Sequence, residues 1–282
     1  MTLVTLLGWV GGVTLALVGL SLAVIVGRGP VVGFYRDPFG KLRRIAPYVV
    51  FLAVALLVTS VVRRYGPDLS WLIGFQIGGD IYAIEGNFVE WLQTLGNPTV
   101  TGYFALVYIY GYVYLLVFPF LAYALLEDLR SFRVLIMAYV LNYVLGLVCY
   151  ILFIAYGPRN FLVGESLLYQ AWPQSQLLTS TVNVNTNVFP SLHASLSMTV
   201  AIIALRTRDA YPRWPLVAVP MALSVCGATM YLGIHWATDV VAGAVLAVVS
   251  VRGGDLLHDR FRRGIDETRQ LWHRVVEAAP VP

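Results

Sequence analysis

The chain has 282 residues, of which 59% are hydrophobic and 12% are charged, with a net charge of +4 and a mean hydropathy of +0.74. A soluble domain of this size would expose far more apolar surface than water tolerates, so the composition excludes an ordinary soluble protein. The positive charge does not indicate a nucleic-acid-binding protein, because the basic residues lie between apolar segments and form no single basic domain.

Several apolar segments are long enough, or nearly long enough, to cross a bilayer, which takes about 20 residues. We therefore expect an all-α fold, a polytopic membrane bundle of about seven transmembrane helices. The first segment has no basic region before it, so we expect a membrane helix that is not cleaved as a signal. The fifth and the last are short, which indicates that they begin at or below the membrane surface. The seven segments are residues 3–27, 46–62, 101–125, 133–156, 190–205, 215–233 and 235–251.

The arginines and lysines predict the orientation of the bundle. Sixteen of the nineteen basic residues fall in segments 28–45, 126–133, 206–214 and the C-terminal tail, which all lie on one face if there are seven spans. The other face receives only Arg63, Arg64 and Arg159. Because cytoplasmic loops are enriched in basic residues, we expect a multi-pass protein of the cell membrane with an outer N-terminus and a cytoplasmic C-terminus.

Two segments on the predicted outer face are long. In residues 63–101, apolar side chains between Trp71 and Leu92 recur at near-helical spacing, which predicts an amphipathic helix lying in the membrane interface. The second segment, residues 157–189, is largely polar toward its end. Loops of this length are often functional, which makes both segments candidate locations for a site.

The first chemical motif runs from Phe189 to His193. Pro190 suits the first position of a helix, because its missing N–H would be unpaired there in any case. The N–H groups of Ser191, Leu192 and His193 are then expected to point outward. A helix N-terminus of this kind attracts phosphate through its free donors and its dipole.

The second motif is His235 and Asp239, which are four residues apart and therefore share one face of a helix. A carboxylate that binds one imidazole nitrogen leaves the other as a potential nucleophile. Arg159 is the only basic residue of the second outer segment, and a guanidinium suits bidentate phosphate binding. Because the fifth and seventh helices run in the same direction, both histidines and Arg159 are expected at one membrane depth.

Each of these residues also has an ordinary explanation. A single histidine near a helix end is usually an interfacial residue, Asp239 alone suits a structural carboxylate, and Arg159 alone suits a headgroup anchor. It is the combination at one depth that favours a site, and ionisable groups within spans are often functional.

Other reactive residue types are expected to be structural. Cys149 and Cys226 lie in apolar runs without metal-ligand spacing, and His258 and His273 belong to the basic tail. The tyrosines of the third span fit an interfacial belt or a packing role better than catalysis. They are Tyr103, Tyr108, Tyr110, Tyr112 and Tyr114.

Together these motifs resemble the type 2 phosphatidic acid phosphatase (PAP2) superfamily. Pro190-Ser191-Leu192-His193 is similar to that family's Pro-Ser-x-His motif, and His235 with Asp239 is similar to its final His-x-x-x-Asp motif. The form of residues 189–194 is closest to the branch that includes inositol phosphorylceramide synthases. The resemblance spans roughly residues 65–251 and implies a six-helix core.

The resemblance implies a role for each matched residue. His235 would attack phosphorus and form a phosphohistidine, Asp239 would orient it, and His193 would protonate the leaving oxygen. Ser191 and Arg159, with Asn160 as a further donor, would bind the phosphate oxygens. No metal and no cofactor are implied.

The match has two departures. The family has Ser-Arg six to seven residues before the nucleophilic histidine, where this chain has Ala228 and Thr229. The lysine-bearing first motif is absent, and the Gly157–Asn160 segment is a looser match. One cation is little for a phosphate carrying a charge of about two, so Asn185 and Asn187 are further candidate donors.

On this basis we predict N-terminal transmembrane helices over residues 1–62, a catalytic membrane core over residues 63–252 and a basic cytoplasmic tail over residues 253–282. The expected substrate is a lipid phosphate or isoprenoid pyrophosphate on the outer face. The expected partners are that substrate and the bilayer, with no nucleic acid. The oligomeric state is left open.

Three alternatives remain at this stage. The same phosphohistidine could be captured by an alcohol such as inositol or ceramide, which would make the protein a phosphotransferase. His193 and His235 could instead be axial haem ligands, which leaves Asp239 and Arg159 unexplained. A transporter would have polar residues deep in several spans, for which Asn142 and Gln76 are the obvious candidates.

Overall fold

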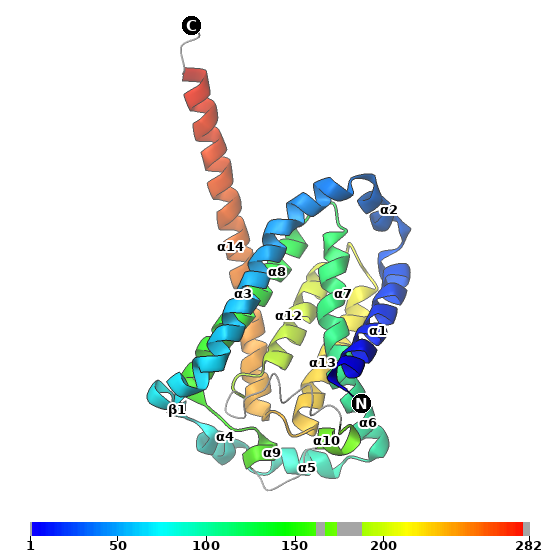
Figure 1. The fold of residues 1–282 in the computed structure, drawn as a ribbon, viewed down its shortest axis with the longest axis vertical. Coiled ribbons are helices and arrows are strands. Elements are labelled where there is room, and N and C mark those ends of the chain that lie inside the picture. Colours follow the sequence, from blue (N-terminus) through cyan, green and yellow to red (C-terminus); the bar gives the residue numbers. More distant parts are fainter. Residues whose placement is uncertain (1, 162–166, 174–187, 279–282) are drawn as a thin grey trace.

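The computed structural model describes residues 2–161, 167–173 and 188–278. Helices dominate this part of the chain (Figure 1). The helices are α1 (Leu3–Ser21) with a π-helical extension (Leu22–Val26), α2 (Arg28–Arg36), α3 (Pro38–Ile73), α4 (Gly78–Glu85), α5 (Phe88–Thr94), α6 (Pro98–Leu106), the π-helix η2 (Val107–Gly111), α7 (Tyr112–Ala124), α8 (Arg130–Leu152), α9 (Pro158–Phe161), α10 (Leu167–Ala171), α12 (Leu192–Arg206), α13 (Trp214–Tyr231) and α14 (Ala237–Ala278).

The predicted all-α membrane bundle is confirmed. Among the described residues, six helices are long and apolar enough to cross a membrane, and α12, with fifteen residues, is a shorter apolar helix. The six are Leu3–Val26, Pro38–Ile73, Pro98–Ala124, Arg130–Leu152, Trp214–Tyr231 and Ala237–Arg260.

One span differs clearly from its prediction. The second apolar segment, residues 46–62, lies within α3, which continues for eleven residues to Ile73. The paired arginines at 63 and 64, followed by Gly66 and Pro67, predict that the helix ends and a loop begins after residue 62. The structure instead keeps Pro67 inside the helix, so Arg63 and Arg64 are helical residues.

Side-chain caps fix where several helices begin. The Asn97 side chain accepts hydrogen bonds from the backbone N–H groups of Thr99 and Val100, both at 3.0 Å, and Pro98 occupies the first helical position. The Asp37 carboxylate caps α3 in the same way at the N–H of Gly40. These caps satisfy donors that a helix start leaves unpaired.

The bundle is arranged around α12, which contacts α7, α8, α13 and α14 (Figure 1). Glycines allow the backbones to approach closely. A Cβ atom at Gly243 of α14 would lie 2.5 Å from the Ser191 carbonyl oxygen, and one at Gly146 of α8 would lie 2.6 Å from a methyl carbon of Leu192. Small residues at crossings are the usual means by which membrane helices pack.

A buried polar bridge also joins α8 to α12. The Asn142 side-chain nitrogen donates to the Ala138 carbonyl at 2.7 Å and to the Thr199 hydroxyl at 3.0 Å, while the Ser195 hydroxyl donates to the Asn142 side-chain oxygen. Asn142, which the sequence marked as a possible transport residue, therefore makes a hydrogen-bonded contact between helices.

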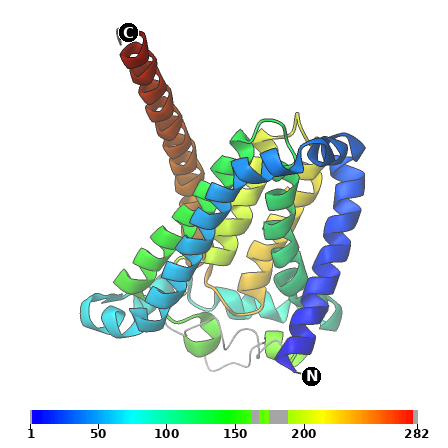
Figure 2. The same cartoon turned by 45° about the horizontal axis from the view of Figure 1, so that its top comes forward.

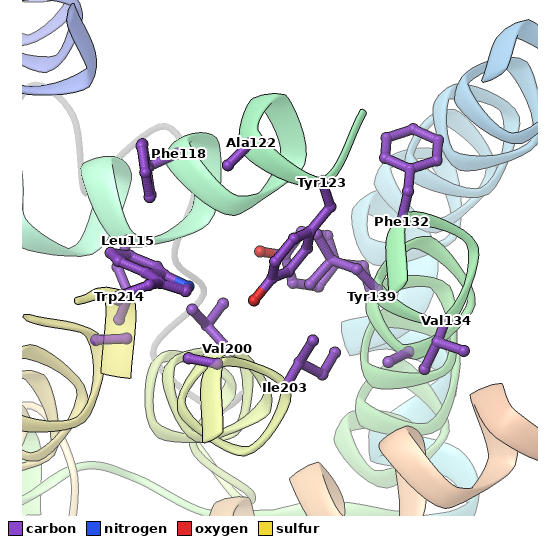
Figure 3. Packing of buried hydrophobic residues seen from close by; sticks show 14 of the residues in the cluster. Leu115, Phe118, Ala122, Tyr123, Phe132, Val134, Tyr139, Val200, Ile203 and Trp214 are labelled. Carbon is purple, nitrogen blue, oxygen red and sulfur yellow. The ribbon is translucent and has the colours of Figure 1, made fainter. Parts of the chain in front are cut away.

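At one end of the bundle, apolar and aromatic side chains from α7, α8, α12 and α13 form the aromatic core (Figure 3). Phe118 packs edge-on against Trp214 at a centroid separation of 4.5 Å. The Tyr123 hydroxyl lies 2.7 Å from that of Thr207. These two hydroxyl groups therefore form a hydrogen bond with each other inside the core.

The opposite end carries short elements that link the spans (Figure 1). Strand β1 (Phe75–Gln76) pairs in parallel with β2 (Phe153–Ile154), which joins the end of α3 to the end of α8. The prediction of one continuous interfacial helix between Trp71 and Leu92 is wrong, because the structure has two short helices in this region. In its place are α4 and α5, separated at Gly86, whose φ of 54° favours glycine.

Helices α1 to α3 lie on the outside of the bundle, and α1 stands at its edge in the turned view (Figure 2). The N-terminus is at the end that carries the short elements, while α14 runs through the bundle and projects beyond the other end (Figure 1). The positive-inside orientation of these two ends stays a prediction.

Candidate active site

The loop between α13 and α14 places His235. Gly233 has a φ of 71°, a conformation that favours glycine, and its Cβ position would lie 3.0 Å from the Gln93 side-chain nitrogen. After this turn, the backbone N–H groups of Ile234 and His235 both donate to the Thr229 carbonyl at 3.0 Å. Two donors on one carbonyl hold the backbone of His235 in a fixed place just before α14 begins.

His235 and Asp239 meet as their spacing predicts. The Nδ1 atom of His235 lies 3.4 Å from the Asp239 Oδ2 atom, and both side chains are almost fully buried. The same carboxylate oxygen accepts a 2.8 Å hydrogen bond from the Trp236 N–H, which fixes its orientation. Because Nδ1 faces the carboxylate, the Nε2 atom is left for a reacting group.

The start of α12 is joined directly to the start of α14. Ser191 caps α12 by accepting a hydrogen bond from the Ala194 N–H at 3.3 Å, and its own N–H donates to the Asp239 carbonyl at 3.0 Å. Pro190 therefore precedes the cap, and the prediction that it opens the helix is wrong by two residues. The backbone hydrogen bond from Ser191 to Asp239 nevertheless joins the segment that carries His193 to the segment that carries His235.

The free donors at this helix end are fewer than predicted. Of the three N–H groups expected to point outward, that of Ser191 donates to the Asp239 carbonyl at 3.0 Å. The contact between α12 and α14 therefore uses a donor that the sequence assigned to phosphate. Cationic side chains must contribute more of the binding of an anion here.

His193 lies in the first turn of α12 and faces His235. Their ring centroids are 5.9 Å apart, which leaves a position for one tetrahedral group about 3 Å from each ring. Tyr108 and Tyr112 pack against His193 at centroid separations of 4.9 Å and 4.6 Å. The aromatic pair thereby restricts the orientation of the imidazole.

The tyrosines of the third span thus have different places. Tyr108 lies within the π-helical turn η2 and Tyr112 directly follows it, so a local helix irregularity brings both to His193. Tyr103, Tyr110 and Tyr114 instead contact Ser224, Trp172 and Ser21, which agrees with a packing role. Spacing alone could not identify the two that line the site.

Arg159 is held beside the His235 loop. Its backbone N–H donates to the Gly233 carbonyl at 3.0 Å, and its guanidinium lies 5.2 Å from the ring centre of Tyr169. Its Nη1 atom is buried and has no hydrogen-bond partner among the described residues. A buried guanidinium N–H in this state is suited to an anionic ligand.

The structure says less about the asparagines that are candidate phosphate donors. Asn160 follows Arg159 in α9 but is exposed, so its assignment as a phosphate donor stays a prediction. Asn185 and Asn187 lie outside the described residues.

The positions that depart from the family pattern are buried. Ala228 is fully buried, and the Thr229 hydroxyl donates to the Cys226 carbonyl at 2.8 Å. Neither side chain supplies a cation.

Sequence reasoning missed Glu85, which caps α14 from another element. Its carboxylate accepts hydrogen bonds from the backbone N–H groups of Ala237, at 2.9 Å, and Thr238. These donors lie between His235 and Asp239 in the chain, so Glu85 at the end of α4 fixes the turn that carries His235. A glutamate 152 residues before Ala237 leaves no local sequence signal for such a cap.

The described residues contain no group of three or more His, Cys, Asp or Glu side chains arranged to hold a metal ion. What the site offers is a buried imidazole–carboxylate pair, a facing imidazole and a nearby guanidinium, at one end of a helical membrane bundle.

The chain belongs to the PAP2 superfamily, whose family pattern matches residues 83–252, more than half of its length. The match includes every predicted site residue and Glu85, and leaves out α1 to α3. It supports a phosphatase-type activity, either phosphatase or phosphotransferase. Comparisons with curated proteins and with solved structures find no match.

Proposed function

We propose that the protein hydrolyses a lipid phosphate or isoprenoid pyrophosphate through a phosphohistidine intermediate. One observation carries the proposal: the buried His235–Asp239 pair faces His193 across 5.9 Å. A nucleophile oriented by a carboxylate, opposite a second imidazole, is the arrangement that two-step phosphoryl transfer requires.

In the first step, the Nε2 atom of His235 attacks the terminal phosphorus, and the bond from this phosphorus to the oxygen of the leaving group breaks. His193 gives its proton to that oxygen, so a lipid phosphate releases an alcohol and an isoprenoid pyrophosphate releases the lipid monophosphate. Asp239 stabilises the positive charge that develops on His235. In the second step, His193 takes a proton from a water molecule while the water oxygen attacks phosphorus. The bond between phosphorus and the Nε2 atom of His235 breaks, and free phosphate leaves.

The location of the site supports the proposal of a lipid substrate. His193 and His235 lie at the ends of apolar helices, where a phosphate headgroup meets the chain while its hydrocarbon stays in the bilayer. If the bundle has the orientation that its basic residues predict, the site opens to the outer leaflet. The identity of the lipid chain is left to experiment.

A second candidate is a phosphotransferase, in which an alcohol such as inositol or ceramide replaces water in the second step. The form of residues 189–194, which is similar to that of inositol phosphorylceramide synthases, favours it. Both reactions share the first step and the same residues, so they differ only in the acceptor.

The test is phosphate release by detergent-purified protein from a panel of lipid phosphates, with EDTA present and the H235A variant in parallel. We expect release by the wild type and a loss of more than about 10³-fold in H235A, because the nucleophile is gone. Substantial residual release by folded H235A would show that His235 is not the nucleophile. Labelled lipid product formed only on addition of an alcohol would establish the transferase instead.

A further inference from the structure

The segment that links α3 to α6 lies across the end of the bundle that carries the histidine site (Figure 1). Helix α3 ends at Ile73 and α6 begins at Pro98, and both belong to helices long and apolar enough to cross the membrane. Helices α4 and α5 lie between them. Because both ends of this segment are joined to spans, α4 and α5 are held close to the level at which those spans enter the bilayer.

The inner face of this helix pair packs against the residue that follows His235. Ile81 of α4 and Val89 of α5 are buried in one apolar cluster with Trp236. The centroid of the Tyr82 ring, also on α4, lies 6.2 Å from that of Trp236. The two helices are therefore in direct packing contact with the turn that carries His235.

Polar side chains of the same two helices hold both ends of that turn. Glu85 at the end of α4 accepts hydrogen bonds from the first two backbone N–H groups of α14. The Gln93 side-chain nitrogen of α5 donates to the carbonyl of Tyr231, the last residue of α13, at 2.9 Å. Residues 232–236, which include His235, thus lie between the bonds from α4 and the bond from α5.

The outer face of the helix pair is apolar and exposed. Ile84 is 77% exposed, Trp91 53% and Leu95 60%. Phe88, Trp91 and Leu95 are three and four residues apart, so they lie on one side of α5. The rings of Phe88 and Trp91 are 5.8 Å apart, centroid to centroid. Tryptophan and large apolar residues in such a place are typical of helices that lie in a membrane interface.

The charges of the segment indicate which part of the bilayer this face binds. Residues 74–97 contain three acidic side chains, Asp80, Glu85 and Glu90, and no Lys or Arg. Surfaces that bind anionic headgroups are rich in Lys and Arg, so this segment is not suited to them. Burial of its apolar side chains among zwitterionic headgroups and the adjoining acyl chains is the contact that it can make.

We propose that the outer face of α4 and α5 binds the interface of the bilayer, and that this contact positions the turn that carries His235 through Glu85 and Gln93. The inference rests on the proposed function. It makes Glu85 and Gln93 positioning residues, and it makes catalysis by His235 depend on the contact of a surface segment with lipid as well as on the substrate phosphate.

The test compares F88A/W91A with the matched control Y35A/F39A, in full-length protein reconstituted into phosphatidylcholine nanodiscs. Tyr35 and Phe39 are exposed aromatic side chains of α2 and of the start of α3, at the opposite end of the bundle (Figure 1). Each protein is measured for backbone hydrogen exchange in residues 232–238, for kcat and KM with the best lipid phosphate, and for the midpoint of thermal unfolding.

We expect F88A/W91A to speed hydrogen exchange in residues 232–238 by about fivefold and to lower kcat by a similar factor, because the turn is held less firmly. KM should change by less than about twofold, since the substituted side chains do not bind the phosphate. Y35A/F39A should leave exchange and kcat within about twofold of wild type. If F88A/W91A does not fold, W91A is compared with Y35A, and faster exchange is expected in W91A alone.

The route of the coupling is tested in the E85A/Q93A background. There the further substitutions at Phe88 and Trp91 should change exchange by less than about twofold, because both polar links have already been removed. An undiminished effect in this background would show that Glu85 and Gln93 do not carry the coupling.

The occupant of the outer face is tested by quenching of tryptophan fluorescence with brominated phosphatidylcholine. Comparison with W91F isolates the signal of Trp91, and we expect that signal to be quenched. A Trp91 signal that brominated lipid does not quench would overturn the bilayer contact and would mean that a second copy or another protein covers this face.

Equal exchange and equal kcat in wild type and F88A/W91A would overturn the coupling, as would faster exchange without a fall in kcat. A change in KM alone would instead show that the exposed side chains capture substrate. A lower midpoint of unfolding with unchanged exchange in residues 232–238 would assign them to the fold only. Absence of wild-type phosphate release would defeat the proposed function separately, because exchange and quenching are measured without turnover.

Discussion

The aromatic core and the histidine site are built at two ends of the same helices but treat their polar groups differently. In the core, the Tyr123 hydroxyl is paired with Thr207, and the Tyr211 hydroxyl donates to the Ala122 carbonyl at 2.8 Å. In the histidine site, a buried Arg159 nitrogen and the Oδ1 atom of Asp239 have no hydrogen-bond partner among the described residues. Among its described residues, the core leaves only a neutral group, the Trp214 Nε1 atom, without a geometric partner in this comparison, whereas the site leaves groups of charged side chains that a ligand or water can use.

This contrast predicts that substitutions in the site change rates and substitutions in the core change stability. The largest effect is expected for D239N. An amide keeps the shape of the side chain but not the charge that stabilises the His235 imidazolium, so kcat should fall roughly 10²- to 10³-fold. Turnover and thermal unfolding are measured alongside D80N, an exposed aspartate of α4. A near-normal rate in D239N would reduce Asp239 to a structural carboxylate.

The next largest effect is expected for W214A in the aromatic core. Trp214 is fully buried against Phe118, so its loss should lower the free energy of unfolding by about 3 kcal/mol and leave kcat per folded molecule nearly unchanged. Unfolding in detergent is compared with that of L216A, which removes an exposed side chain from the same helix. A fall in kcat without a loss of stability would break the proposed division between the two regions.

A smaller effect is expected for E85A, which removes the cap on α14. Loss of a cap typically costs about 1 kcal/mol, so a displaced His235 turn should lower kcat by up to about tenfold with little change in KM. E85Q keeps an acceptor and should lose less, and E90A removes an exposed acid from the neighbouring helix as a control. Identical kcat values for E85A and E90A would show that the cap does not position His235.

The smallest effect is expected at the Asn142 bridge. A double-mutant cycle of N142A and T199V should give a coupling free energy of roughly 0.6 kcal/mol, as hydrogen bonds between membrane helices usually do. Turnover per folded molecule should change by less than about twofold, because the bridge contacts neither histidine ring in the described structure. A large loss of activity at normal stability would mean that the histidine site extends to this bridge.

The sequence predicted those parts of the site that depend on local spacing. His235 and Asp239 are four residues apart on one face, and Ser191 and His193 mark a helix start, so topology alone placed them at one end. Glu85 and the pair Tyr108 and Tyr112 were not identifiable, because a cap from a distant element and a π-helical turn leave no periodic signal.

The same limit explains the error at α3. Two arginines, Gly66 and Pro67 lower the hydropathy and usually end a helix, yet Pro67 loses only its own bond to the carbonyl four residues earlier, that of Arg63. Packing against α8 and the β1–β2 pairing hold the continuation. Tertiary contacts, which the sequence pattern does not show, therefore decided the length of this helix.

The shortness of α12 gives the bilayer itself a part in the reaction. Its fifteen residues extend about 22 Å, against a hydrocarbon thickness of about 30 Å. We therefore expect His193 to lie below the level of the surrounding headgroups, so that a lipid phosphate must sink, or the bilayer must thin locally, before it reaches the histidine. Membranes of shorter acyl chains should lessen that hydrophobic mismatch and raise turnover without any change in the protein.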